Sequence, residues 1–195
     1  MQLTFPTILT LLRIALIPVL VLFFYLPYQW SNFACMVVFV TAAITDLLDG
    51  YLARKTGQST SFGAFLDPVA DKLMVATALI LLLQYHPTAL FAIASAIIIG
   101  REITISALRE WMAELGESGL VKVTNFGKVK TGFQMTAISF LLYRDPLLGL
   151  PMGFLGELLL YTAAALTLWS MYTYIVAAWP AMSSAGQINT DEVDF

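Results

Sequence analysis

The stretch that decides the fold is DLLDGYLARKTGQSTSFGAFLDPVAD, residues 46–71. It places four aspartates where two long apolar segments meet, in a chain that is 59% hydrophobic and only 12% charged. A soluble domain carries about 25% charged residues, roughly twice that share. Acidic side chains in membrane segments are costly, and those that occur there mostly serve a function. We therefore expect an integral membrane protein with a polar site built on these aspartates.

Six apolar segments are long enough to be membrane helices, since a span needs about 20 such residues. The expected ranges are 7–26, 31–53, 62 or 67 to 85, 88–115, 126–143 and 151–178. We expect the last helix to stop before Pro180, because proline disrupts a helix interior. The sequence thus predicts an all-α, six-helix membrane domain over residues 1–179. Residues 180–195 are expected to form a polar, acidic and disordered tail.

The basic residues predict the orientation of these helices. Six spans place both termini on one side, and nine of the ten Lys and Arg residues lie on that side as well. The exception is Arg144. Because basic residues favour the cytoplasmic side of a membrane, we expect both termini and the four aspartates to be cytoplasmic.

The aspartates are spaced in pairs that share a helix face. Asp46 and Asp49 are three residues apart, and Asp67 and Asp71 are four apart. Two consecutive antiparallel helices can bring these faces together, where four carboxylates would repel one another without a cation. Oxygen ligands with no His or Cys cluster favour Mg²⁺ or Mn²⁺. Four carboxylates can hold two such ions across a phosphate.

Three structural alternatives stay open at this point. Asp67 followed by Pro68 is also a good helix start. Arg54 and Lys55 can serve as ion-pair partners of Asp46 and Asp49. The small residues Gly50, Ala53 and Gly63 can serve close helix packing rather than approach of a ligand.

The full pattern, D-x-x-D-G-x-x-A-R, eight residues, then G-x-x-x-D-x-x-x-D, resembles the signature of the CDP-alcohol phosphotransferases. The resemblance implies six membrane helices, a homodimer, and an active site that opens at the cytoplasmic face. It also implies transfer of a phosphoryl-linked group from a CDP-linked donor to an alcohol, with release of CMP and with divalent metal.

The resemblance also implies a role for each matched residue. Asp46, Asp49 and Asp67 would bind metal, and Asp71 would complete the metal site and act as general base. The donor would be bordered by Asp49, Gly50, Ala53, Arg54, Gly63 and Asp67. No covalent nucleophile is needed, which favours direct displacement.

A second set of residues suggests an anionic acceptor. Arg101 and Arg109 are eight residues apart on one helix face, and Lys128 and Lys130 come to the same membrane side. Cations beside a metal site favour a phosphate on the acceptor. The alternative is ordinary cytoplasmic anchoring, with Glu102 and Glu110 as partners. The two lysines are about 200° apart on a helix, so we expect only one of them to face a pocket.

Three further stretches, FPTILTLLRIALIP, REITISALREWMAELG and GKVKT, resemble the bacterial branch of this family that makes phosphatidylglycerophosphate. This resemblance implies CDP-diacylglycerol as donor, sn-glycerol 3-phosphate as acceptor, a bacterial inner membrane, and no nucleic-acid partner. One departure is Thr7, where many relatives have Asn.

Other functions stay open from the sequence. Another branch of the family would use inositol phosphate, serine or phosphatidylglycerol as acceptor. An intramembrane prenyltransferase also uses aspartates with Mg²⁺. A divalent-cation transporter would spread its acids through the membrane depth, whereas the four aspartates here cluster on one side. The single His86 lies in a turn on the opposite side and is expected to be interfacial.

Overall fold

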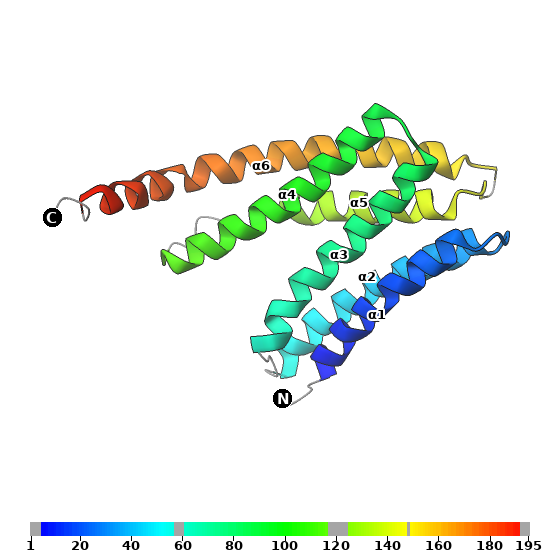
Figure 1. Cartoon of the computed structure of the whole chain (residues 1–195), viewed down its shortest axis with the longest axis horizontal. Coiled ribbons are helices and arrows are strands. Elements are labelled where there is room, and N and C mark those ends of the chain that lie inside the picture. The colour runs from blue at the N-terminus through cyan, green and yellow to red at the C-terminus, as the bar shows by residue number, and fades with distance from the viewer. Residues whose placement is uncertain (1–4, 57–60, 117–124, 148, 192–195) are drawn as a thin grey trace.

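The computed structural model describes residues 5–56, 61–116, 125–147 and 149–191. Within these ranges the side chains of 5–6, 49–56, 61–62, 64, 125–129 and 181–191 are not described. The described residues form six helices: α1 (Phe5–Tyr25), α2 (Ser31–Thr56), α3 (Ser61–Tyr85), α4 (Ala89–Glu114), α5 (Asn125–Tyr143) and α6 (Met152–Asp191). Figure 1 shows both termini toward one end of the bundle and the α1–α2, α3–α4 and α5–α6 turns at the other.

The helices confirm the all-α expectation for the described residues, where the only bridge outside helices joins Leu147 and Leu150. Four helices are long and apolar enough to cross a membrane, over residues Thr7–Tyr25, Ser31–Leu48, Ala89–Glu114 and Met152–Pro180. The chain is therefore a multi-pass membrane protein.

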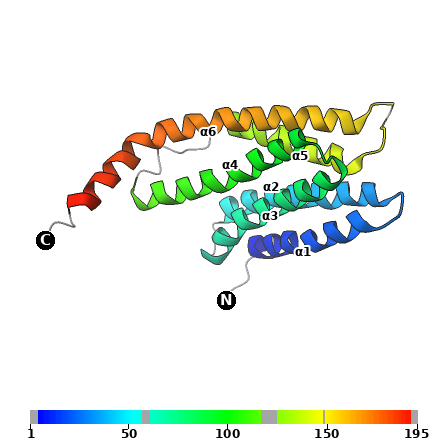
Figure 2. The same cartoon turned by 45° about the horizontal axis from the view of Figure 1, so that its top comes forward.

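The predicted end of the last helix is wrong. Pro180 does not stop α6, which continues to Asp191. Figure 2 shows that α6 bends toward its C-terminal end, as expected where proline removes one backbone hydrogen bond without ending the helix. Of the two starts expected for the third helix, the one near residue 62 is confirmed and the one at residue 67 is not, because α3 begins at Ser61 and holds Pro68 in its interior. The capping role considered for Asp67 is thereby excluded.

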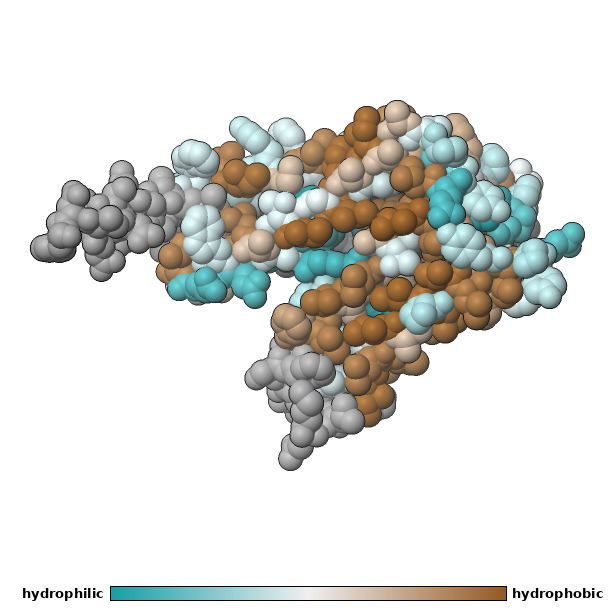
Figure 3. Space-filling view, in the orientation of Figure 1, coloured by the Kyte–Doolittle hydropathy of each residue, from teal (hydrophilic) through white to brown (hydrophobic). Residues whose placement is uncertain are grey.

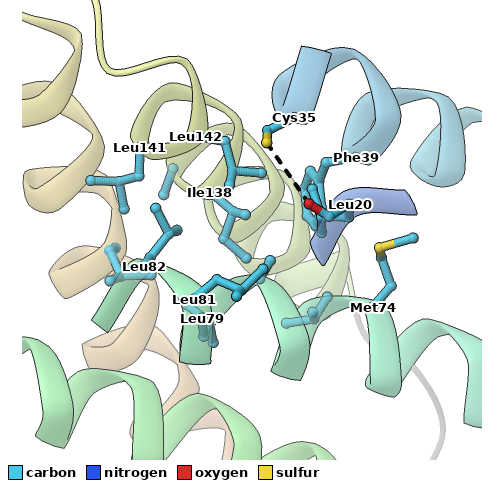
Figure 4. Close-up of a cluster of buried hydrophobic side chains, with 14 of the residues drawn as sticks. Leu20, Cys35, Phe39, Met74, Leu79, Leu81, Leu82, Ile138, Leu141 and Leu142 are labelled. Atoms are coloured by element: carbon cyan, nitrogen blue, oxygen red, sulfur yellow. Dashed lines mark hydrogen bonds between the residues drawn. The ribbon is translucent and has the colours of Figure 1, made fainter. Parts of the chain in front are cut away.

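The main core draws buried side chains from all six helices, with the largest share from α3. Figure 4 shows leucines of α3 and α5 facing Phe39 and Cys35 of α2, with the Cys35 thiol 3.9 Å from the Leu20 carbonyl oxygen. The buried Cys35 is a packing residue of this core. At Gly156 an added Cβ would lie 2.7 Å from the Leu141 side chain, so this glycine permits close packing of α6 on α5.

The helices divide into two groups, α1–α3 and α4–α6, that separate toward the end carrying the termini. Figure 3 shows a notch between α3 and α4, with hydrophilic side chains at its inner end and hydrophobic side chains over much of the visible face. A groove of about 210 Å³ lies between these two helices, and Lys72 and Glu102 are its charged lining residues. The other residues that line this groove are apolar.

Candidate active site

Three of the four predicted aspartates converge on one buried cation, Arg13 of α1. Its Nη1 atom lies 3.2 Å from Oδ1 of Asp46, 3.1 Å from Oδ1 of Asp67 and 2.5 Å from Oδ1 of Asp71. The Arg13 side chain is 1% exposed, whereas the three carboxylates are 29–38% exposed. The predicted convergence of the two helix faces is confirmed for these three residues.

Local structure explains this convergence. Asp67 and Asp71 are one turn apart on α3, so their side chains point the same way. Asp46 comes from α2, and α1 packs against both α2 and α3. The three helices thus bring one guanidinium and three carboxylates together near the end of the bundle that carries the N-terminus.

Sequence reasoning missed Arg13 as a site residue and used it only for membrane orientation. The signal was present, because Arg13 is the one charged residue in the apolar segment 7–26. A charge in such a segment is a functional candidate by default, since its burial is costly without a partner.

The three carboxylates are the right chemical set for a hard divalent cation, but they are spaced for a guanidinium. Mg²⁺ takes oxygen ligands at about 2.0–2.1 Å, whereas two of the contacts to Arg13 are longer than 3 Å. Among the described residues, no group of three or more His, Cys, Asp or Glu side chains is already arranged to hold a metal ion. The carboxylate oxygens are suitable metal ligands. To bind an ion at the position of Arg13 Nη1, these oxygens must move closer to that position.

Part of the predicted signature lies outside the described side chains. Asp49, Gly50, Ala53 and Arg54 are on α2, but their side chains are not described, so the ion-pair alternative for Arg54 is untested. Gly63 is described and lies partly buried on α3, four residues before Asp67.

The predicted basic residues form a second cluster between α4, α5 and α6. Lys130 Nζ donates to Glu102 Oε1 at 2.7 Å, and Arg101 Nη1 donates to the same oxygen at 3.2 Å. The guanidinium carbons of Arg101 and Arg109 lie 5.7 and 5.8 Å from the centre of the Tyr174 ring. Arg101, Arg109 and Lys130 are therefore brought together, while the Lys128 side chain lies outside the described residues.

This basic cluster is buried and carries excess positive charge. Lys130 is 1% exposed and Arg101 is 7% exposed, yet one carboxylate, Glu102, contacts both. The anchoring alternative was right that Glu102 pairs with Arg101. However, the buried Nε atoms of Arg101 and Arg109 have no hydrogen-bond partner among the described residues. A buried donor without an acceptor is costly, so these guanidinium groups are suited to an anionic ligand.

Sequence reasoning also missed two residues of α6 that hold this cluster. Ser170 accepts a 3.2 Å hydrogen bond from Arg101 Nη2, and Tyr174 lies under both guanidinium groups. Tyr174 is itself anchored in a small core with Ile105 and Met112. Their sequence neighbourhood, residues 165–179, contains no charged residue, and no local pattern singles them out.

The opposite end of the bundle holds different pairs. His86 Nδ1 lies 2.7 Å from Glu157 Oε1, and the His86 ring stacks on Phe91. The Arg144 guanidinium lies 3.4 Å from the centre of the Tyr85 ring, and Arg144 has a φ of 61°, which ends α5. These contacts join the turns at that end, far from the aspartates along each helix.

A family sequence model described as CDP-alcohol phosphatidyltransferase matches residues 3–169 of this chain. The chain belongs to the CDP-alcohol phosphatidyltransferase family. The match includes every predicted site residue, from Asp46 to Lys130, and also Arg13. It ends at residue 169, just before Ser170 and Tyr174.

Curated relatives of this CDP-alcohol phosphatidyltransferase are similar along most of the chain. Proteins from Escherichia coli strain K12, Shigella flexneri and Pectobacterium atrosepticum are each 52% identical to it over 178 residues. The similarity covers 91% of this chain and 96% of each relative. All three relatives are named CDP-diacylglycerol–glycerol-3-phosphate 3-phosphatidyltransferase.

Proposed function

We propose that this protein transfers the phosphatidyl group from CDP-diacylglycerol to sn-glycerol 3-phosphate, giving phosphatidylglycerophosphate and CMP. The structural observation that carries the proposal is the pairing of two sites, converging aspartates and a buried basic cluster. The first suits a metal-dependent phosphoryl transfer, and the second suits an acceptor that itself carries a phosphate. The 52% identity to relatives of that name supports the same reaction.

We assign the metal site to Asp46, Asp49, Asp67 and Asp71, as the family resemblance implies. Four carboxylates can hold two ions, which we propose to be Mg²⁺ or Mn²⁺. When bound, such ions neutralise the pyrophosphate of the donor and stabilise charge on the departing CMP. Gly50, Ala53, Arg54 and Gly63, with Asp49 and Asp67, would border the CDP part of the donor.

The protein's own groups would carry the remaining chemistry. The acceptor hydroxyl oxygen forms a bond to the donor's β-phosphorus, and the bond from that phosphorus to the CMP oxygen breaks. Asp71 takes the hydroxyl proton as general base, and CMP leaves with the electron pair of the broken bond. Because the displacement is direct, no covalent intermediate with the protein forms.

The acceptor phosphate would be held by Arg101, Arg109 and Lys130. Glu102 now occupies the contacts that a phosphate would make with Lys130 and Arg101. The free Nε donors of the two arginines would complete the binding of a phosphate, which offers more acceptor oxygens than one carboxylate. We expect Lys128 to contribute less, because it lies on a different face of α5 from Lys130.

We propose six membrane spans with both termini and the active site at the cytoplasmic face of a bacterial inner membrane. The distribution of Lys and Arg supports this orientation, and Figure 1 places both termini toward one end of the bundle. A diacylglycerol anchor keeps the donor headgroup at interfacial depth, which suits aspartates near the helix ends. We further propose a homodimer and a membrane domain over 1–179, beyond which α6 continues to Asp191.

The proposal is tested by CMP release from purified protein in detergent. With CDP-diacylglycerol and Mg²⁺, we expect release that depends on sn-glycerol 3-phosphate and is lost when EDTA removes the metal. Parallel reactions contain serine, inositol phosphate or phosphatidylglycerol in place of glycerol 3-phosphate. A reaction with isoprenyl diphosphate as donor covers the prenyltransferase alternative.

The outcomes of this experiment separate the two sites. Release with another acceptor would retain the aspartate site and contradict the assignment of the basic cluster. Release that persists in EDTA would contradict the metal assignment. No release with any acceptor, from folded protein, would contradict the enzyme itself and favour cation transport, which liposome flux would then measure.

We predict that Arg109→Ala raises the KM for glycerol 3-phosphate about tenfold or more. A charge-assisted hydrogen bond contributes about 1.5–3 kcal/mol, and 1.4 kcal/mol corresponds to about a factor of ten. The KM of Arg109→Ala for CDP-diacylglycerol should stay nearly constant. In the control Arg144→Ala, at the opposite end of the bundle, the KM values for both substrates should stay nearly constant. Equal changes in both KM values for Arg109→Ala would remove it from the acceptor site.

A further inference from the structure

Arg13 lies at the point on which the predicted metal ligands converge. A single terminal nitrogen contacts Oδ1 of Asp46, Asp67 and Asp71, and the side chain that carries it is 1% exposed. Such burial of a guanidinium is costly unless carboxylates compensate its charge. Here the compensation comes from residues that the proposed function uses for another purpose, namely to bind metal.

The guanidinium and a divalent cation cannot share these oxygens unchanged. Arg13 holds them at hydrogen-bond distances of 2.5–3.2 Å. Mg²⁺ requires its ligand oxygens at about 2.0–2.1 Å and in near-octahedral geometry. An ion at that distance would also be a second positive charge close to Nη1, and the two cations would repel each other. Binding of metal through the same Oδ1 atoms therefore requires Arg13 to release some of its contacts.

We propose that Arg13 is an internal counter-cation that holds the three carboxylates together without metal and competes with the metal for them. The inference rests on the proposed metal role of the same aspartates. It assigns Arg13 a positioning role in two states of the site. In the metal-free state its charge replaces that of the ion, and in the metal-bound state it yields at least one carboxylate.

The surroundings of Arg13 limit where its side chain can move. The cavity beside Arg13 and Asp71 is about 10 Å³, roughly the size of one water molecule. Phe39, Met74 and Met135 line it and offer no charged partner. The guanidinium has no room to retreat into the bundle, so it stays beside the carboxylates. The displacement must therefore be small and directed toward their exposed side.

The role has two consequences of opposite sign. Loss of Arg13 leaves three nearby carboxylates without their cation, which destabilises the metal-free protein. The same loss removes the competitor, which strengthens metal binding. If Arg13 had only a packing role, its loss would destabilise the protein equally with and without metal. The dependence of stability on metal therefore distinguishes a packing role from the proposed counter-cation role.

The test compares Arg13→Gln with wild type and with Arg144→Gln, a matched change of a half-buried arginine at the opposite end. Mn²⁺ binding is measured by electron paramagnetic resonance, and thermal unfolding is measured in EDTA and in Mg²⁺. We expect Arg13→Gln to bind Mn²⁺ about 5- to 150-fold more tightly than wild type, the usual range of coupling between sites. Its unfolding midpoint should fall by roughly 5–10 °C in EDTA and recover largely in Mg²⁺. Arg144→Gln should change neither the affinity nor the response to Mg²⁺.

Several results would overturn the inference. If Arg13→Gln binds Mn²⁺ with wild-type affinity and Mg²⁺ stabilises both proteins equally, the metal site is intact but Arg13 does not compete for it. No Mn²⁺ binding by wild type would refute the metal site itself and the inference with it. If Arg13→Gln is not recovered folded, Arg13→Met removes the charge with an unbranched apolar side chain that suits the buried position. Its Mn²⁺ affinity should exceed that of wild type, and an equal or weaker affinity would refute competition.

Discussion

Asp71→Asn should lower turnover by about 100- to 10,000-fold, the contribution usual for a general base. The amide is close in size to the carboxylate but cannot accept the proton of the acceptor hydroxyl. The other carboxylates remain on α2 and α3, so binding of CDP should be retained in large part. The measurement is the rate of CMP release at saturating substrates, together with the affinity for CDP.

The matched control for this substitution is Asp145→Asn. Asp145 lies at the opposite end of the bundle, where its carboxylate contacts the Asn32 side chain at 3.5 Å. We expect wild-type turnover from that variant. Wild-type turnover from Asp71→Asn would refute the base assignment, and a loss of CDP binding equal to the loss of turnover would make Asp71 a binding residue instead.

Glu102→Gln should destabilise the protein by about 3 kcal/mol, the lower end of the range for breaking a buried ion pair. Lys130 and Arg101 would then stay buried without the carboxylate that now contacts both. The expected fall in the unfolding midpoint is roughly 6–12 °C for a chain of this size. Since Glu102 keeps 29% side-chain exposure, we place the effect at the lower end of that range.

Glycerol 3-phosphate should restore part of this stability, because its phosphate can replace the lost carboxylate and binding to the folded state stabilises it. The exposed Glu110 is on the same helix, and Glu110→Gln should change stability by less than about 0.5 kcal/mol. Thermal unfolding with and without glycerol 3-phosphate measures both effects. Equal stabilisation of Glu102→Gln and wild type by the ligand would show that the phosphate binds elsewhere.

The sequence predicted the helices well because their signals are local. Long apolar runs placed six helices to within a few residues at most ends, and the spacing of Asp67 and Asp71 placed both on one face. The prediction failed at Pro180, where a local proline rule competes with helix continuity on both sides, and it left the start of α3 open between residues 62 and 67. Proline can bend a long helix without ending it.

The partners of the site residues depended on contacts between helices that are distant in the chain. Arg13 lies 54 residues from Asp67, and Arg101 lies 69 residues from Ser170. No local period links such positions, so the sequence determined the acidic and basic residue types and only predicted the membrane side they share. Only the packing of α1 on α2 and α3 decided that Arg13 lies among the aspartates. Likewise, only the packing of α4 on α6 decided that the Tyr174 ring lies against Arg101 and Arg109. The physical reason is that burial makes each charge depend on a partner within a few ångströms, and only tertiary packing sets those distances.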